Sequence, residues 1–454
     1  MSELFGADSA KGIAVADLTC EIAMQAGRAS AAVLARGQGK KSKIIVGKDG
    51  KRSSDILEAA VCAGICSAGA DAECVGAVPA PAAAWLVKEH SADACIMITA
   101  ASGGESSGIT IFSPEGRRFG RDIEDQIESR VFGIGAGSAL ALPRAEIGRM
   151  IHSENAADEY IEHIRSLIDT DFTGLRVAVC CLESCAAVTA ERLFTALGAE
   201  VIMLEETDND FASDIDLGST SYERLMELTA ASGCDCGLYF TTDGCGCLAA
   251  DENGNTADGD TILAILAKYY KERGRLKNDT VAVNIMSGLG LFNFARDNGM
   301  TLRTSGAVGR HVLDRMLEEH CALGGEKSGH IIFLDDSPLA DGQLCGARLL
   351  EALKYTGKRF SELAGEMEKL PQIVLNVRIS PRKREIWKND EVITGLIREK
   401  EELLGTGGRI LVREAASSDP FIRVMIEGHD FSKINEMAVE VARKIKERCS
   451  PDAR

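Results

Sequence analysis

The sequence is short of positive charge. Its 454 residues include 51 Lys and Arg against 69 Asp and Glu, which leaves a formal net charge of −18 at pH 7. Nucleic acids and anionic membranes are bound mainly through Lys and Arg on phosphate groups. The charge balance therefore argues against a nucleic-acid partner and against a membrane partner.

Long hydrophobic runs are also missing. No stretch approaches the roughly 18 uninterrupted apolar residues of a membrane span. The first residues, MSELFGADSAKG, contain neither a basic start nor the apolar core of a secretion signal. We therefore expect a cytoplasmic protein, in which the 15 cysteines are reduced thiols.

Several common site motifs are absent as well. GKDGKRS at 47–53 has the wrong glycine spacing for a P-loop, and GIGAG at 133–137 lacks the third glycine of a dinucleotide-binding loop. The chain has no HExxH motif and no Ser-His-Asp order. These absences exclude the commonest nucleotide-binding, zinc-protease and serine-hydrolase sites.

A cysteine-rich stretch, CDCGLYFTTDGCGC, suggests a soft-metal site at first sight. Cys236 opens a predicted strand, and Cys245 follows its far end. At about 3.3 Å per residue, the strand separates the two cysteine pairs by more than a metal–thiolate bond. We interpret these cysteines as small buried hydrophobic residues. The alternative is a rearranged site that combines Cys245 or Cys247 with Cys181 or Cys185.

Short β-branched runs alternate with helical patterns along most of the chain, which is typical of βαβ units. After Leu370-Pro371 the order changes to β-α-β-β-α, typical of a small α+β domain. We predict three tandem α/β domains with mixed, mainly parallel sheets, followed by a C-terminal α+β domain. A Gly-rich linker is predicted at 133–146. The predicted domain boundaries are 1–150, 151–256, 257–369 and 370–454.

Gly-rich loops follow predicted strands at 99–108, 241–246 and 287–290, where open α/β sheets bind ligands. Together with GGEKSGH at 324–330 and the α+β tail, their order resembles the α-D-phosphohexomutase family, most closely the bacterial phosphoglucosamine mutases and phosphomannomutases. The opening MSELFGADSAKG is similar to the family's FGTDGxRG, and LPQIVLNVR and GRILVR also resemble family segments. The resemblance implies four domains around a central cleft.

The reactive loops depart from the family pattern. The family's phosphoserine loop reads SASHNP, whereas this chain has TAASGG at 99–104. A gap-free comparison places Ala101 at the phosphoserine position, and a one-residue slip would place Ser102 there. The family's metal loop, DGDGDR, supplies three carboxylates to Mg²⁺. Here it reads TTDGCG, in which Thr241 and Cys245 flank the one remaining ligand, Asp243.

Other positions keep parts of the pattern. Glu326, Ser328 and His330 match the sugar-reading loop, and the resemblance implies that Glu326 and Ser328 contact sugar hydroxyls. The family's RPSGTEP phosphate loop is replaced by REAASSDP, in which Glu414 adds a negative charge. The predicted phosphate-binding residues are Arg413, Ser417, Ser418 and Arg423. Lys11, Lys48 and Lys51 stand near positions of family arginines and are predicted to supply charge.

The preferred hypothesis from these losses is a catalytically degenerate homologue without a resident cofactor. It would bind a hexose or hexosamine phosphate weakly, or a protein partner, as a homodimer or in a complex with an active mutase. The first alternative is an active phosphosugar mutase that uses Ser102 as a displaced phosphoserine and Asp243 to hold Mg²⁺. The second alternative is thiol or soft-metal chemistry on the same frame.

Overall fold

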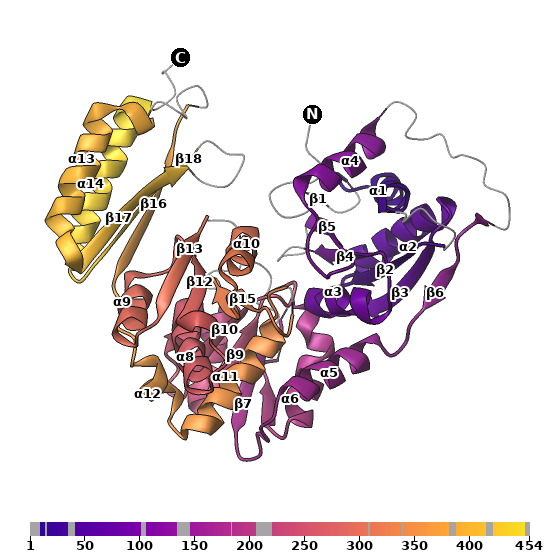
Figure 1. Ribbon diagram of the computed structural model, residues 1–454, viewed down its shortest axis with the longest axis horizontal. Helices are drawn as coiled ribbons and strands as arrows, with labels where there is room; N and C mark the ends of the chain where they lie inside the picture. The colour runs from indigo at the N-terminus through magenta and orange to yellow at the C-terminus, as the bar shows by residue number, and fades with distance from the viewer. Residues whose placement is uncertain are drawn as a thin grey trace. The chain divides into compact units, whose positions relative to one another are not determined.

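The computed structural model describes residues 10–13, 16–34, 41–100, 106–133, 146–182, 184–205, 220–306, 309–337, 339–380, 387–414 and 421–449. The chain forms two compact units: residues 1–284 with 303–365, and residues 285–302 with 366–454. Figure 1 shows the order of their helices and strands. Among the described residues, no helix combines the length and the apolar character needed to cross a membrane.

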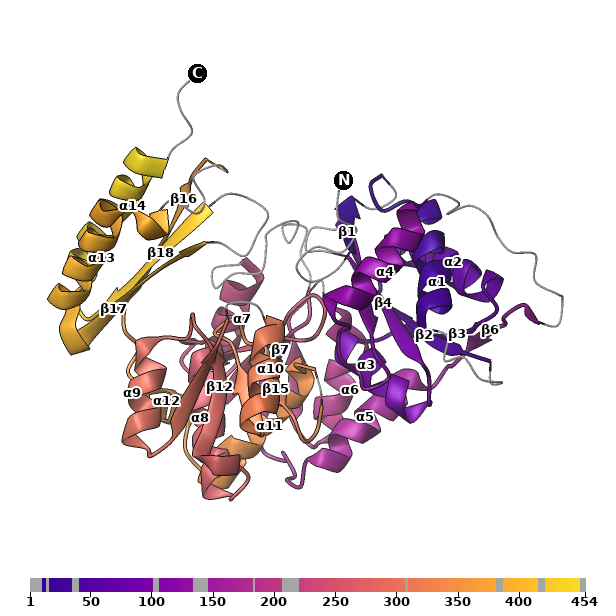
Figure 2. The same ribbon diagram turned by 45° about the horizontal axis from the view of Figure 1, so that its top comes forward.

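The first sheet has six strands in the order β1-β5-β4-β2-β3-β6. They are β1 (Ala10–Ile13), β2 (Lys43–Lys48), β3 (Asp71–Ala77), β4 (Ala94–Ala100), β5 (Ser106–Phe112) and β6 (Met150–His152). β2, β3, β4 and β6 are parallel, whereas β5 is antiparallel to β1 and β4. Helices α1 (Cys20–Leu34), α2 (Arg52–Ser67) and α4 (Arg121–Phe132) form one layer, and α3 (Ala80–Glu89) lies on the other face (Figure 2).

Small residues set the close approach of α1 and α2. A Cβ atom added at Gly27 would lie 2.3 Å from the carbonyl oxygen of Val61, and one added at Gly64 would lie 2.0 Å from that of Met24. Both distances are far shorter than a van der Waals contact. Any larger residue at either position would therefore force the two helices apart and open the core beneath them.

The second sheet has the order β11-β10-β9-β7-β8. Its strands are β7 (Arg176–Cys180), β8 (Glu200–Met203), β9 (Cys236–Phe240), β10 (Cys247–Asp251) and β11 (Thr256–Ala257). β7 is parallel to β8 and β9, and β10 turns back antiparallel to β9. Its helices are α5 (Ala156–Leu167), α6 (Ala190–Ala196) and α7 (Thr220–Ala231), with a 3₁₀ turn, η2, at Cys185–Val188.

The third sheet, β13-β12-β14-β15, is smaller. Its strands are β12 (Thr280–Asn284), β13 (Thr301–Ser305), β14 (Leu323–Gly325) and β15 (Ile331–Phe333). β12 and β14 are parallel, and β15 is antiparallel to β14. The helices of this part of the chain are α8 (Gly259–Glu272), α9 (Leu289–Asp297), α10 (Gly309–Glu319), α11 (Gly342–Thr356) and α12 (Phe360–Ala364).

The C-terminal sheet is antiparallel throughout, in the order β16-β18-β17. Its strands are β16 (Gln372–Arg378), β17 (Gly408–Glu414) and β18 (Phe421–Gly428), covered on one face by α13 (Glu391–Leu404) and α14 (Phe431–Cys449) (Figure 1). The helical segment between β16 and β17 consists of two parts. Asp390 caps α13 by accepting N–H bonds from Val392 and Ile393, and a short 3₁₀ turn precedes it.

The predicted fold class is confirmed: three sheets with parallel central pairs precede an antiparallel α+β domain. Strands β1, β3, β6, β10, β11, β13 and β14 were not predicted from the sequence. The linker predicted at 133–146 lies mostly outside the described residues, and the domain boundaries stay predictions.

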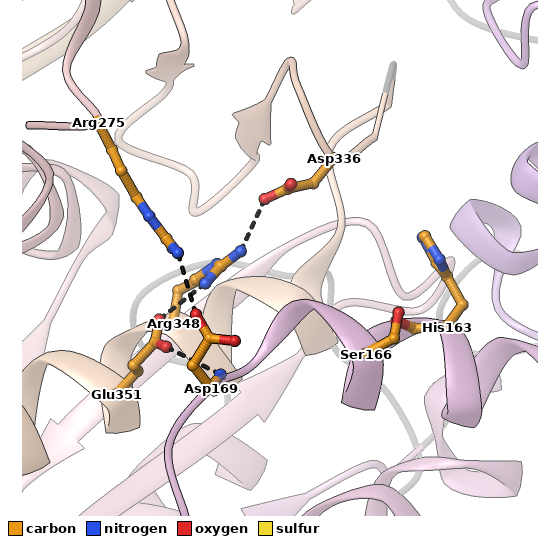
Figure 3. Close-up of polar contacts among 7 residues, drawn as sticks. All are labelled: His163, Ser166, Asp169, Arg275, Asp336, Arg348 and Glu351. Atoms are coloured by element: carbon orange, nitrogen blue, oxygen red, sulfur yellow. Dashed lines mark hydrogen bonds and ion pairs between the residues drawn. The ribbon is translucent and has the colours of Figure 1, made fainter.

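Helix α11 is buried from its first residue, Gly342, to Leu353, and it carries a charged side chain inside that stretch. The Arg348 guanidinium donates to Glu351 Oε2 at 2.8 Å and to Asp336 Oδ2 at 2.9 Å. The other Glu351 oxygen accepts the N–H of Asp169 at 3.4 Å, and Arg275 binds the Asp169 carboxylate at 3.3 Å (Figure 3). This ion-pair network ties α11 to the segment that follows α5.

Removal of the central cation should destabilise the first unit. In Arg348→Met, two carboxylates lose their buried partner, and we expect the free energy of unfolding to fall by about 3–5 kcal/mol. Urea unfolding measures the change. Arg192→Met removes an exposed ion pair with Asp158 and serves as the control, with an expected loss of at most about 1 kcal/mol. Equal losses in the two variants would contradict a buried structural role.

A histidine joins α3 and β3 to α5. His90 Nδ1 lies 2.7 Å from Glu73 Oε1, and its Nε2 lies 2.7 Å from Glu159 Oε2. Lys43 also pairs with Glu73, at 2.9 Å. Burial lowers the pKa of His90, but the hydrogen bond to Glu159 and the charge of Glu73 outweigh burial, so the pKa is raised. Both ring nitrogens face carboxylates, so the charged imidazolium fits this position.

The raised pKa gives stability a defined pH dependence. The stabilisation from His90 is fully present below its unfolded pKa of about 6.5 and is lost as pH rises through the higher folded pKa. His90→Asn should therefore reduce the free energy of unfolding at a pH of about 6 and change it less at a pH of about 9. Urea unfolding at both pH values tests this, with exposed His152→Asn as control. A loss of unfolding free energy in His90→Asn that is larger at the higher pH than at the lower pH would contradict this prediction.

Candidate active site

The turn at 241–246 joins β9 to β10 and closes on itself through hydrogen bonds. The Thr241 hydroxyl donates to Asp243 Oδ1 at 2.8 Å and accepts the N–H of Gly246 at 2.7 Å. The N–H of Cys245 donates to the same carboxylate oxygen at 3.0 Å. Thr241 and Cys245 are buried, and Asp243 is half-buried. The side chain of Thr241 thus acts as a structural brace of the turn.

Three successive carbonyls of this turn accept N–H groups from the first residues of three helical segments. The carbonyl of Thr242 accepts from Cys185 at the start of η2, and that of Asp243 accepts from Ala80 at the start of α3, each at 3.0 Å. The carbonyl of Gly244 accepts from Gly342 at the start of α11, also at 3.0 Å. These first-turn N–H groups have no partner inside their own helices. The turn therefore lies where three parts of the first unit meet.

The predicted sugar-reading loop lies beside this turn. A β-bridge pairs Gly246 with His330, and the N–H of Cys247 donates to the carbonyl of Gly329 at 3.0 Å. Gly329 has a φ of 90°, a conformation that favours glycine. Within the loop, the Ser328 hydroxyl lies 3.3 Å from Glu326 Oε2 and 3.0 Å from His330 Nδ1. The structure therefore brings Asp243 together with Glu326, Ser328 and His330.

The Asp243 carboxylate lies among donors and positive charges. Burial raises its pKa, but His330, the N–H of Cys245, the hydroxyl of Thr241 and Arg118 together outweigh burial, so the pKa is lowered. Arg118 follows β5 and forms a β-bridge with Phe112. Sequence reasoning missed Arg118. The Arg117-Arg118 pair just after the GITIF strand was the signal that could have singled it out.

Asp49 fixes the end of the strand that leads to the predicted nucleophile. Its carboxylate is buried and accepts the N–H groups of Lys51 and Ala100. Ala100 is the last residue of β4. Ala101 and Ser102 lie outside the described residues, so the position of the predicted nucleophile stays a prediction.

The predicted charge-supplying lysines differ in their surroundings. Lys48 Nζ binds Asp55 at 2.8 Å and Glu58 at 2.6 Å. Burial lowers the pKa of Lys48, but these hydrogen bonds outweigh burial and raise it. Its charge is therefore shared with two carboxylates of α2. Lys51 is the N-terminal cap residue of α2, and the backbone of Lys11 pairs with Gly108 in β5.

The C-terminal unit carries the predicted phosphate-binding arginines. Arg413 on β17 pairs directly across the sheet with Arg423 on β18. Burial, together with the charge of Arg423, lowers the pKa of Arg413, and Arg413 Nε is buried without a hydrogen-bond partner among the described residues. The negative charge of Glu414 pairs with Lys388 at 2.7 Å. Ser417 and Ser418 lie outside the described residues.

The cysteine pairs are separated as the strand length predicted. Cys236 pairs with Asp251, and Cys247 pairs with Phe240, at opposite ends of the β9–β10 hairpin. In the described part of the chain, no group of three or more His, Cys, Asp or Glu side chains is placed to hold a metal ion. Burial raises the pKa of both Cys185 and Cys245 well above the usual range, which keeps them neutral thiols.

Comparison with known proteins agrees with this architecture. Residues 2–137 match phosphoglucomutase/phosphomannomutase alpha/beta/alpha domain I, residues 258–370 match domain III, and residues 375–444 match the C-terminal domain. Phosphoglucosamine mutases of Acetivibrio thermocellus and Clostridium novyi are each 40% identical to 99% of this chain over their whole length. The chain belongs to the phosphohexomutase family.

Solved structures of phosphohexomutases share the fold. A phosphoglucomutase/phosphomannomutase family protein from Burkholderia thailandensis has a TM-score of 0.81 with 21% identity, covering 100% of this chain and 99% of its own. Aspergillus fumigatus N-acetylphosphoglucosamine mutase in complex with GlcNAc-6P and magnesium has a TM-score of 0.60 with 13% identity, covering 82% and 93%. At these identities the likeness concerns the fold alone.

The hypothesis of a catalytically degenerate homologue is wrong. The full-length identity of 40% to curated phosphoglucosamine mutases favours the alternative, an active phosphohexomutase. That hypothesis rested on the family residues lost from three loops, whereas the similarity extends over 99% of the chain. In the structure, hydrogen bonds of Thr241, Asp243, Cys245 and Gly246 close the altered turn at 241–246, and a β-bridge joins it to the loop at 326–330.

Proposed function

We propose that this protein is a phosphosugar mutase that moves a phosphoryl group between two hydroxyls of a hexosamine or hexose phosphate. The full-length similarity to phosphoglucosamine mutases carries this proposal and favours a glucosamine phosphate as substrate. The proposed nucleophile is Ser102. Phosphoserine would give its phosphoryl group to the free sugar hydroxyl, and the resulting bisphosphate would return its other phosphoryl group to the serine oxygen.

The arginine pair of the C-terminal unit supports an anionic substrate. Like charges directly opposite each other on adjacent strands destabilise a sheet unless an anion lies between them. Arg413 and Arg423 are such a pair. The buried N–H group at Nε of Arg413 has no hydrogen-bond partner among the described residues and could donate to a ligand. A phosphate group bound here would supply the anion between the two arginines and would accept a charge-assisted hydrogen bond from Arg413 Nε. We propose that Arg413 and Arg423 bind substrate phosphate together with Ser417 and Ser418.

The loop at 326–330 is the proposed sugar-reading element. Glu326 and Ser328 offer oxygen atoms that hydrogen-bond neutral hydroxyl groups, and His330 extends the same chain of contacts. Lys11, Lys48 and Lys51 remain the proposed source of charge near the nucleophile. The four domain boundaries and a homodimer also stay predictions.

The first test concerns the nucleophile. Wild-type protein should interconvert glucosamine 6-phosphate and glucosamine 1-phosphate, and intact mass should show one phosphoryl group after incubation with a hexosamine 1,6-bisphosphate. Ser102→Ala should lose that phosphoryl group and reduce turnover on the order of 10³-fold or more, since a nucleophile has no substitute. Ser106→Ala is the control in the same segment. Full activity in Ser102→Ala would reject this nucleophile, and no turnover of glucosamine, glucose or mannose phosphates by wild type would reject the function.

The second test concerns phosphate recognition. Arg413→Ala should lower kcat/KM by roughly 10–100-fold, because a charge-assisted hydrogen bond contributes about 1.5–3 kcal/mol. Arg413→Lys should recover only part of the loss, since lysine keeps the charge but not the planar fork. Steady-state kinetics measures the effect, with Arg443→Ala on the exposed side of α14 as control. An unchanged kcat/KM in Arg413→Ala would remove this residue from the site.

A further inference from the structure

The turn at 241–246 does not fit a hard divalent cation. Mg²⁺ requires oxygen ligands in near-octahedral geometry and is usually held by carboxylates. The turn offers one carboxylate, and Asp243 Oδ1 already accepts hydrogen bonds from the Thr241 hydroxyl and the Cys245 N–H. The Thr241 hydroxyl is engaged on both sides, as donor to Asp243 and acceptor from Gly246. A thiol at Cys245 is a soft donor that suits other metals.

Fixed positive charge reaches the same turn from the protein itself. Arg118 acts on both Asp243 and Cys245, and its backbone is fixed by the β-bridge to Phe112. Helices α3 and α11 begin against the turn through Ala80 and Gly342, so the positive ends of two helix dipoles also face it. Phosphoryl transfer depends on positioning and on neutralising phosphate charge, and fixed cations can do both.

We propose that the 241–246 turn works without a resident Mg²⁺, because hydrogen bonds from the Thr241 hydroxyl and the Cys245 N–H hold the Asp243 carboxylate in its place. The expected turnover in the absence of Mg²⁺ rests on the proposed mutase function. The metal independence of the turn rests on its donor set and hydrogen bonds alone. The two parts can therefore fail separately.

Metal binding is tested first, without reference to activity. Calorimetric titration of wild-type protein with Mg²⁺, after dialysis against EDTA, should give no saturable binding, and Mg²⁺ should leave the melting temperature unchanged. Thr241→Asp/Cys245→Asp restores two carboxylates and should create a saturable, Asp243-dependent site. If that variant fails to fold, Cys245→Asp serves instead. Saturable binding to wild type that is lost in Asp243→Asn would overturn the proposal.

Turnover is tested next, with the phosphosugar that wild type converts fastest. Wild-type turnover should survive EDTA. Loss of wild-type turnover in EDTA, restored by Mg²⁺, would overturn metal independence while the mutase function stands.

If wild type neither binds Mg²⁺ nor converts any phosphosugar, the proposed mutase function is wrong, and the proposal that the 241–246 turn holds no Mg²⁺ is supported. If wild type converts phosphosugars and binds Mg²⁺ through Asp243, the mutase function is supported, and the proposal that the turn holds no Mg²⁺ is wrong. The binding and kinetic arms therefore distinguish the two proposals in every case.

Discussion

Three backbone hydrogen bonds onto one turn fix the candidate site. The carbonyls of residues 242–244 accept N–H groups from the first residues of η2, α3 and α11. A buried backbone carbonyl or a helix-end N–H left without a partner costs free energy, so these pairings set the turn and the three segments together. Any movement of one segment would break a hydrogen bond in the turn. These backbone contacts thus fix the backbone of Asp243, and the hydrogen bonds from Thr241 and Cys245 fix its carboxylate.

The same turn depends on a charge network some distance along α11. Arg348 is buried, and only its pairing with Asp336 and Glu351 makes that burial tolerable. Because its partners lie before and within the helix, the guanidinium fixes how α11 is rotated and how far it is shifted along its axis (Figure 3). Gly342 at the start of α11 then meets the carbonyl of Gly244. A stabilising ion pair and the turn of the candidate site are therefore joined through the same helix.

Much of this fold follows from local sequence patterns. Buried strands such as β2, β4, β7 and β12 are short β-branched runs between glycine-bearing loops, and such runs predict parallel central strands. Strand β3, DAECVGA, carries Asp, Glu and Gly. Its strand character comes from tertiary context, in which Glu73 is neutralised by Lys43 and His90. Local propensity could not show that partnership.

The candidate site was harder to predict, for a different reason. In the sequence, Asp243 lies on one loop and Glu326, Ser328 and His330 lie on another. The bridge between Gly246 and His330 and the hydrogen bond from Cys247 to Gly329 join the two loops. Motif comparison also assigned each residue one fixed role, so Thr241 counted as a lost ligand. In the structure Thr241 stabilises the turn, because its hydroxyl donates to the Asp243 carboxylate and accepts the N–H of Gly246. An ionised carboxylate at position 241 could accept hydrogen bonds but could not donate one. A substitution that removes a ligand can therefore stabilise the same turn by another interaction, and counting motif residues alone cannot distinguish loss from replacement.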